Sequence, residues 1–381
     1  MADSEKVTLI AAGDIMPRRE HAEEFFDYTR SILQKGDITL GQLERPITEK
    51  SDLYRSATEV QPTKLATILA DTGFNILTFA SNHAMDAGDE GLLDTIDMMK
   101  KNNVAVIGVG KNIEEARKPV IIECKGTKVG FLDYCSVMAP GDEAGEYCAG
   151  VCPIKITTAY QVSTVQPGNP PQRIITNANA KDLAAMIEDI QDLRSRVDVL
   201  VVSQHWGIHF VTSPIADYEY EIGHAAIDAG ADIVIGTHAH TLKGIEVYKG
   251  KVIFHCLGNF AFDHMIAGRT PIPGGMKIDS HNYAVWPTGR IGWKVDPDYP
   301  THAFPIDCLK SILLKCDIVN KKIQRVAFLP CWLTKKGQPE ILSRSDPRSS
   351  EVYHYIEWLC EDQQLYDTRF SREGDEIVVC V

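Results

Sequence analysis

The chain alternates short apolar runs with longer amphipathic stretches, a rhythm typical of an α/β protein. Short apolar runs bounded by turn residues predict strands, and apolar residues spaced three and four apart predict helices. The predicted strands are 7–12, 38–43, 75–80, 104–109, 120–124, 128–134, 197–203, 232–236, 245–248, 251–257, 312–318 and 322–328. The predicted helices are 22–33, 62–71, 90–101, 180–193, 216–229 and 352–360. Because helices separate many of the strands, we expect parallel strands joined by helical crossovers.

Two segments interrupt this alternation. Residues 139–173 are rich in glycine, proline and polar residues, and we interpret them as an irregular excursion. Residues 265–305 hold aromatic and histidine side chains among prolines and glycines, which is typical of either a lid or a packed surface loop. We expect one domain over residues 6–365, with 366–381 as a C-terminal tail or an added strand.

Polar side chains follow five of the predicted strands, just past their carboxyl ends. They are Asp14, Glu44, Asn82 with His83, His205, and His238 with His240. In α/β sheets the ligand crevice lies at these ends, so the side chains are expected to converge. Each piece alone is more often a turn residue, a helix cap or a packed histidine, but five occurrences together favour a shared site.

The chemistry of these residues indicates a metal site. Carboxylates, imidazoles and an amide oxygen suit Mn²⁺, Fe²⁺ or Zn²⁺, and the set contains no thiolate. Seven candidates are too many for one tetrahedral ion. They suit two ions bridged by a carboxylate, roughly 3.5–4 Å apart, an arrangement used for displacement at phosphorus.

Charge and composition restrict the partners. Lysine and arginine number 39 against 52 aspartates and glutamates, and the net charge of −13 argues against nucleic acid or an anionic membrane as a partner. No apolar run reaches the ~18 residues of a membrane span. We expect no signal peptide before the first strand, and we expect the ten cysteines, which include no CxxC pair, to be reduced thiols. We therefore expect a cytoplasmic protein with no nucleic acid partner and no membrane span. The acidity does not exclude an anionic substrate, small or peptide-like, in a local pocket.

Five ordered stretches resemble the CapA family, named for poly-γ-glutamate capsule biosynthesis, which belongs to the calcineurin-like metallophosphoesterases. They are residues 12–16, 43–48, 81–88, 204–207 and 228–240, and the last continues into 244–250 and 257–260. The resemblance covers roughly residues 6–265. It implies a four-layer α-β-β-α sandwich, in which two sheets are flanked by helices and metals lie at the strand ends.

The resemblance also implies roles for the residues at the strand ends. Asp14 would be the first-strand ligand and Glu44 the bridging carboxylate. Asn82 would be the amide ligand, and His205, His238 and His240 the imidazole ligands. His83 would face the leaving group as an acid, and Asp14, His83 and His240 are the expected catalytic residues.

The chain departs from the wider superfamily beside these motifs. Phosphatases carry Asp-x-His on the first strand, whereas Met16 follows here, and a thioether is a poor ligand for a hard dinuclear site. We therefore expect one metal to bind weakly. His209 and His255 also replace residue types usual in the family, which suggests altered substrate contacts.

Three arginines are candidates for binding an anionic group of the substrate. Arg18, Arg19 and Arg45 follow two of the ligand motifs, and arginine binds phosphate or carboxylate in a bidentate manner. A solvated surface arginine is the alternative for each of them.

Three functions remain open from the sequence. The first is a metal-dependent hydrolase that uses metal-activated water on a phosphoester or on an amide of a γ-glutamyl or peptide-like substrate. The second is a metal-independent isomerase or epimerase, in which Asp14 and a site histidine act as an acid–base pair. The third is a non-catalytic accessory subunit of polyglutamate or amide-ligase machinery.

Overall fold

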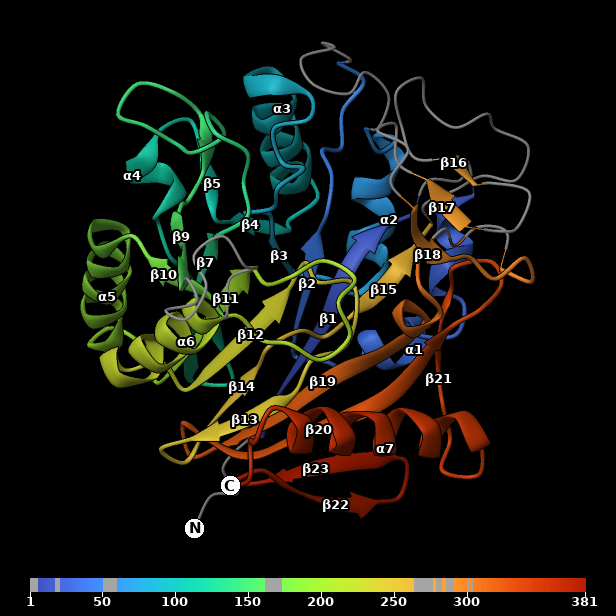
Figure 1. Ribbon diagram of the computed structural model, residues 1–381. Helices are drawn as coiled ribbons and strands as arrows, with labels where there is room; N and C mark the ends of the chain where they lie inside the picture. The colour runs from blue at the N-terminus through green and yellow to red at the C-terminus, as the bar shows by residue number, and fades with distance from the viewer. Residues whose placement is uncertain are drawn as a thin grey trace.

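The computed structural model in Figure 1 contains two large sheets that face each other. It describes residues 6–17, 21–50, 60–161, 173–263, 277–278, 283–285, 291–299, 302 and 304–381. The larger sheet has the strand order β22-β23-β20-β19-β1-β2-β3-β4, with β15 paired to β1 and β21 to β20. The smaller sheet has the order β13-β14-β12-β11-β7-β6.

The strands have the following bounds. The larger sheet contains β1 (Val7–Met16), β2 (Ile38–Leu43), β3 (Ile76–Thr78), β4 (Ala105–Ile107), β15 (Asn259–Phe262), β19 (Lys310–Val319), β20 (Lys322–Leu333), β21 (Pro339–Ile341), β22 (Arg369–Glu373) and β23 (Glu376–Cys380). The smaller sheet contains β6 (Val120–Cys124), β7 (Thr127–Cys135), β11 (Val199–His205), β12 (Ile233–Thr237), β13 (Ile245–Tyr248) and β14 (Lys251–Phe254). Shorter pairings join β5 (Val109–Gly110) to β8 (Gly150–Val151), β9 (Ile156–Gln161) to β10 (Arg173–Ala178), and β16 (Lys277–Ile278), β17 (Tyr283–Val285) and β18 (Ile291–Lys294) to one another.

Helices cover the outer faces of both sheets. The α-helices are α1 (Arg30–Leu33), α2 (Lys64–Thr72), α3 (Gly88–Lys101), α4 (Ile113–Ala116), α5 (Ala180–Arg194), α6 (Asp217–Ala229) and α7 (Pro347–Asp362), and the 3₁₀ helices are η1 (Ala22–Phe26) and η2 (Ile306–Leu309). Helices α2 and α3 share a core with the larger sheet, and α5 and α6 share one with the smaller sheet.

Alternation along β1 explains the layers. Leu9 and Ala11 join the core between the two sheets, whereas Ile10 and Ala12 join the core beneath α2 and α3. Successive side chains of a strand point to opposite faces, so one apolar strand supplies two cores. The predicted four-layer α-β-β-α sandwich is therefore confirmed.

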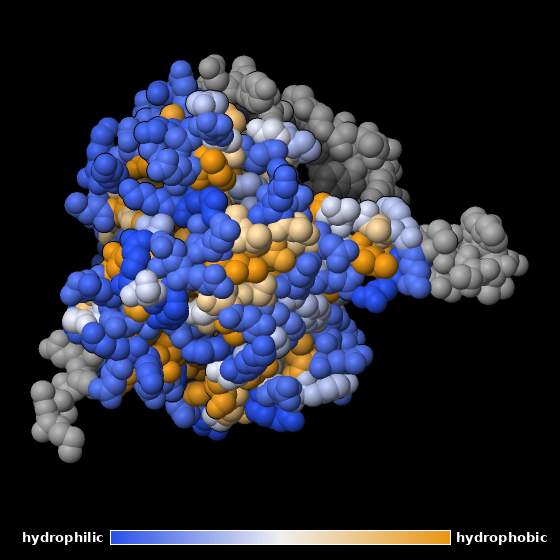
Figure 2. All heavy atoms as spheres, turned by 90° about the vertical axis from the view of Figure 1, so that its left-hand side faces the viewer, coloured by the Kyte–Doolittle hydropathy of each residue, from blue (hydrophilic) through white to orange (hydrophobic). Residues whose placement is uncertain are grey.

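The helices on the smaller sheet direct their apolar residues inward. Met186, Ile190 and Leu193 of α5 recur at helical spacing and are buried against that sheet. Figure 2 views this side of the molecule, where hydrophilic atoms cover most of the surface and apolar patches lie between them. Among the described residues, no helix combines the length and the apolar character needed to cross a membrane.

Two segments differ from the sequence-based expectation. Residues 22–33 form two short helices, η1 and α1, in place of one. The excursion at 139–173 includes β8 and β9, and β9 pairs antiparallel with β10 from Gln161↔Arg173 onward. Most of β9 is exposed, so no alternation of apolar and polar residues marked it as a strand.

The two remaining expectations concern the excursion at 265–305 and the C-terminal residues. Most of the excursion lies outside the described residues, although β16, β17 and β18 form a small antiparallel sheet within it. The C-terminal residues form β22 and β23, and β23 pairs with β20 at the edge of the larger sheet.

Candidate metal centre

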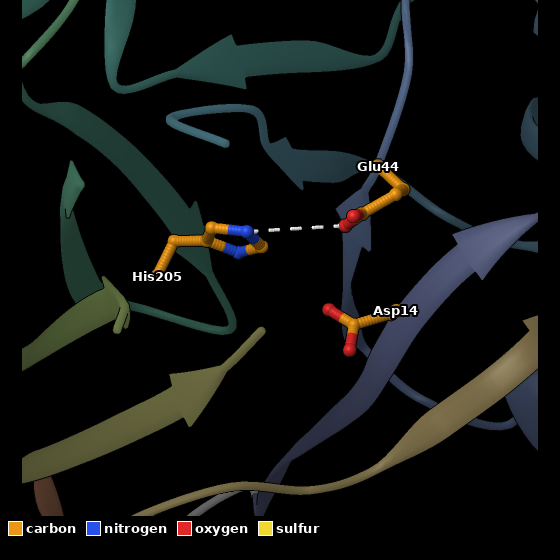
Figure 3. A group of neighbouring side chains, drawn as sticks. All are labelled: Asp14, Glu44 and His205. Carbon is orange, nitrogen blue, oxygen red and sulfur yellow. Dashed lines mark ion pairs between the residues drawn. The ribbon is translucent and has the colours of Figure 1, made fainter. Parts of the chain in front are cut away.

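The carboxyl ends of strands from both sheets meet at one place. Asp14 lies near the end of β1, Glu44 directly follows β2, and His205 is the last residue of β11. One potential ligand atom from each lies within 4.8 Å of the others, and Figure 3 shows the three side chains pointing toward one another. Strands β1 and β2 run parallel, as do β11 and β12, so each sheet delivers its polar residues to the same edge.

One subset of the candidate ligands gathers around Asn82. Its Oδ1 lies 2.9 Å from Nε2 of His205 and 3.1 Å from Nδ1 of His238, and these two ring nitrogens are 3.2 Å apart. Oε2 of Glu44 lies 3.9 Å from Nε2 of His205. Ligand atoms bound to one ion at about 2.0–2.2 Å lie roughly 3 Å apart, so Asn82, His205 and His238 have the spacing of ligands to one ion, with Glu44 beside them.

A second subset lies on the other side of Glu44. Nδ1 of His240 is 3.4 Å from Oδ2 of Asp14, and Nε2 of His240 is 3.9 Å from Oε1 of Glu44. Glu44 therefore borders both subsets, in the position of a bridging carboxylate. Met16 is buried in the apolar core between the sheets, so the second subset has fewer side chains suited to bind a metal ion than the first.

Buried oxygens without partners show that the residues fit a cation. Among the described residues, both carboxylate oxygens of Glu44 lack a hydrogen-bond partner, and Oδ2 of Asp14 faces only Nδ1 of His240, 3.4 Å away. Burial is the main cause that raises the pKa of Glu44, and the negative charge of Asp14 is the second. Burial also lowers the pKa of His205 and of His238 well below the usual range, which keeps both rings neutral. Neutral imidazoles and unpartnered carboxylates are the ligand forms that a divalent ion binds.

Hydrogen bonds behind the cluster orient two of the histidines. Oγ1 of Thr237 donates to the carbonyl of Gln204 and lies 3.0 Å from Nδ1 of His205, whose Nε2 then faces the cluster. Oδ1 of Asn259 lies 2.8 Å from Nδ1 of His240. Such partners fix the tautomer and the direction of a ligating imidazole. Sequence reasoning missed both, although Thr237 and Asn259 lie inside two of the resembling stretches.

His83 is held by a partner that the sequence analysis also missed. Its Nε2 lies 3.9 Å from Oε1 of Glu44, and its Nδ1 lies 2.8 Å from Oδ2 of Asp86. The same carboxylate oxygen accepts a hydrogen bond of 3.1 Å from Arg45. The spacing of three residues between His83 and Asp86 was the available signal. Arg45 is buried and holds Asp86, which gives it a positioning contact where the sequence suggested a substrate contact.

The other expected substrate residues lie in different places. The ring of His209 stacks on His238 with centroids 3.8 Å apart, so it borders the cluster. His255 is buried instead, with Nε2 3.1 Å from Glu246 and its ring stacked on Trp206. The partners of His255 are thus structural ones, and its expected contact with the substrate stays a prediction. Arg18 and Arg19 lie outside the described residues.

Comparisons with known proteins agree with the motifs. The family model described as bacterial capsule synthesis protein PGA_cap matches residues 8–264. The chain is 31% identical to the PGA biosynthesis protein CapA of Bacillus subtilis (strain 168), over 66% of this chain and 62% of the relative. It is 29% identical to the capsule biosynthesis protein CapA of Bacillus anthracis, over 68% of this chain and 61% of the relative. The alignments thus span about three fifths of these relatives.

More distant matches have related descriptions. A probable polyglutamine synthesis accessory protein of Mycobacterium tuberculosis (strain CDC 1551 / Oshkosh) is 25% identical over 60% of this chain and 56% of the relative. Among solved structures, the calcineurin-like phosphoesterase YfkN from Bacillus subtilis superposes with a TM-score of 0.44 at 13% identity, covering 95% of this chain and 99% of that one.

Proposed function

Because the chain belongs to the bacterial capsule synthesis protein (PGA_cap) family, as its motifs predicted, we propose that it is a metal-dependent hydrolase. Its substrate would be a phosphoester or an amide of a γ-glutamyl or peptide-like carboxylate. The observation that carries the proposal is the pair of buried, unpartnered oxygens of Glu44, which lie near Asp14 and face the neutral imidazoles of His205 and His238.

The residues divide into holding and proton-transfer roles. Glu44, Asn82, His205 and His238 would hold one ion, and Asp14, Glu44 and His240 a second, weaker one. Divalent ions held there would supply activated water and stabilise developing negative charge. His83 would give a proton to the leaving group from Nε2, because Asp86 holds its Nδ1 and 27% of its side chain is exposed. His209 would border the bound substrate.

The substrate class follows from the composition of the site and the relatives. A cationic site favours an anionic substrate, and the Bacillus subtilis relative is described as a PGA biosynthesis protein. A γ-glutamyl amide is therefore the amide to test beside phosphoesters.

The decisive test pairs metal content with turnover. The protein is purified without chelator, its Mn, Zn and Fe are quantified, and activity is assayed on p-nitrophenyl phosphate, bis-p-nitrophenyl phosphate and γ-glutamyl-p-nitroanilide with added Mn²⁺. Bound metal with turnover is expected, and Asn82→Ala or His240→Ala should abolish turnover while the circular dichroism spectrum stays unchanged. Full turnover in both variants would rule the hydrolase out.

A second candidate is a non-catalytic accessory role in polymer synthesis. Met16 leaves the second subset short of a ligand, and one relative is described as an accessory protein. This role predicts a stable partner in pull-down experiments and no turnover of any substrate. Turnover that survives chelation, together with uptake of solvent deuterium at a substrate carbon, would instead indicate acid–base isomerisation.

A further inference from the structure

A buried carboxylate joins the two sheets through residues that lie close in sequence to candidate ligands. Asp133 belongs to β7 of the smaller sheet and is buried. Its Oδ2 accepts hydrogen bonds of 3.0 Å from the backbone amide of Phe79 and 2.9 Å from that of Ala80. Both amides directly follow β3 of the larger sheet, so a single oxygen spans the interface between the sheets.

The backbone is shaped to let this carboxylate approach. Gly108 has φ +82°, in the left-handed region that favours glycine, and a Cβ built there would lie 2.3 Å from Oδ2 of Asp133. The amide of Phe79 also donates to the carbonyl of Ile107 at 3.0 Å. The amide of Ala80 is therefore the one that reports most directly on Asp133.

Both ends of the contact lead to candidate ligands. On the smaller sheet, Asp133 is in register with Ser203, two residues before His205. On the larger sheet, Ala80 lies two residues before Asn82, and the neighbouring Ser81 hydroxyl donates to the carbonyl of Glu44 at 2.7 Å. Asn82 then meets His205 at 2.9 Å, across the same interface.

We propose that Asp133 is a positioning residue, which fixes Asn82 of one sheet against His205 and His238 of the other. The proposal rests on the metal site of the proposed function. A ligand set divided between two sheets has the correct spacing only if the sheets are held in register there, and groups behind the ligands commonly change metal affinity 10- to 100-fold. Burial raises the pKa of Asp133 to about 7, so a neutral amide is a close mimic of this side chain.

The test compares Asp133→Ala and Asp133→Asn with Asp232→Ala as a matched control. Asp232 is also an aspartate that accepts a backbone amide, from Leu200 at 2.9 Å, but it lies just before β12, at the opposite end of the smaller sheet. Mn²⁺ affinity is measured by calorimetric titration, and exchange of the Phe79 and Ala80 amides by NMR or mass spectrometry without metal.

Asp133→Ala should bind Mn²⁺ at least tenfold more weakly and exchange the Ala80 amide at least tenfold faster. Asp133→Asn and Asp232→Ala should stay within threefold of the wild type in both measurements. Wild-type values in Asp133→Ala, or an equal loss in Asp232→Ala, would overturn the proposal.

The exchange measurement separates this proposal from the proposed function. If the wild type binds no metal, the hydrolase proposal fails, whereas amide exchange still tests the contact. If Asp133→Ala does not fold, the wild type still provides a test. Exchange of its Ala80 amide at the rate of an unprotected peptide would refute the positioning role of Asp133.

Discussion

Replacing Glu44 by glutamine is expected to stabilise the metal-free protein and to remove most of its response to metal. The carboxylate of Glu44 is buried next to Asp14, and neither of its oxygens has a hydrogen-bond partner among the described residues. Without a metal ion, burial and the charge of Asp14 outweigh the attraction of the groups around it, so the pKa of Glu44 is raised and its charged form is disfavoured. A neutral side chain of the same shape relieves this cost. With a cation the same charge is the shared contact of both ligand subsets.

The size of both effects follows from the burial and the chain length. A buried polar group without a partner costs about 1–3 kcal/mol, and more if it is charged, so the neutral variant should gain about 2 kcal/mol. Summed over 381 residues, the unfolding entropy is about 0.8 kcal/mol/K, so this gain raises Tm by about 2.5 °C in EDTA. Mn²⁺ at a hundred times its Kd adds about 2.7 kcal/mol to the wild type, or about 3 °C.

Differential scanning calorimetry in EDTA and across a Mn²⁺ titration measures both effects. Glu44→Gln should start higher than the wild type and respond by less than about 1 °C at the same Mn²⁺ concentration. Glu246→Gln is the matched control, because this glutamate is buried away from the cluster and should leave the Mn²⁺ response intact. A lower Tm of Glu44→Gln in EDTA, combined with a full Mn²⁺ response, would refute the reasoning.

Two further predictions concern the groups around the site. Asp86→Asn should lower kcat about 10- to 100-fold, because Asp86 orients His83. The shift in Tm caused by Mn²⁺ should stay at the wild-type value, because Asp86 orients no proposed metal ligand. An unchanged kcat would contradict this role. Burial alone would raise the pKa of Glu246, but hydrogen bonds from His224 and His255 outweigh it and lower the pKa to about 2. A depressed carboxyl pKa stabilises the fold above pH 4.5, and this stability, about 3 kcal/mol, is lost as the pH falls from 4.5 toward 2. Chemical denaturation against pH should therefore show a shallower acid slope in Glu246→Gln, and equal slopes would exclude the assignment.

Much of the fold follows from local patterns in the sequence. The predicted strand at 38–43 coincides with β2, and the hairpins near 250 and 320 appear as β13–β14 and β19–β20. These elements are short apolar runs bounded by clear turn residues. The helix expected at 22–33 divides into η1 and α1, and the exposed β9 had no apolar face to reveal it.

The candidate ligands were also accessible to sequence reasoning, for a physical reason. A residue just past a parallel strand is placed at the crevice by the direction of its own strand. Strand assignments alone therefore place Asp14 and Glu44 at one edge of the larger sheet and His205 at an edge of the smaller one.

The residues that orient the ligands depended on tertiary structure. Asp133 acts across two sheets, Asn259 reaches His240 from a separate strand, and His255 is buried by Trp206 and Glu246 in spite of its place beside a motif. The sequence by itself determined which strands form and which polar residues stand at their ends, because both depend on neighbours along the chain. Only the packing of the two sheets decided which side chains face the cluster and which are buried behind it, because that depends on partners far away in the sequence.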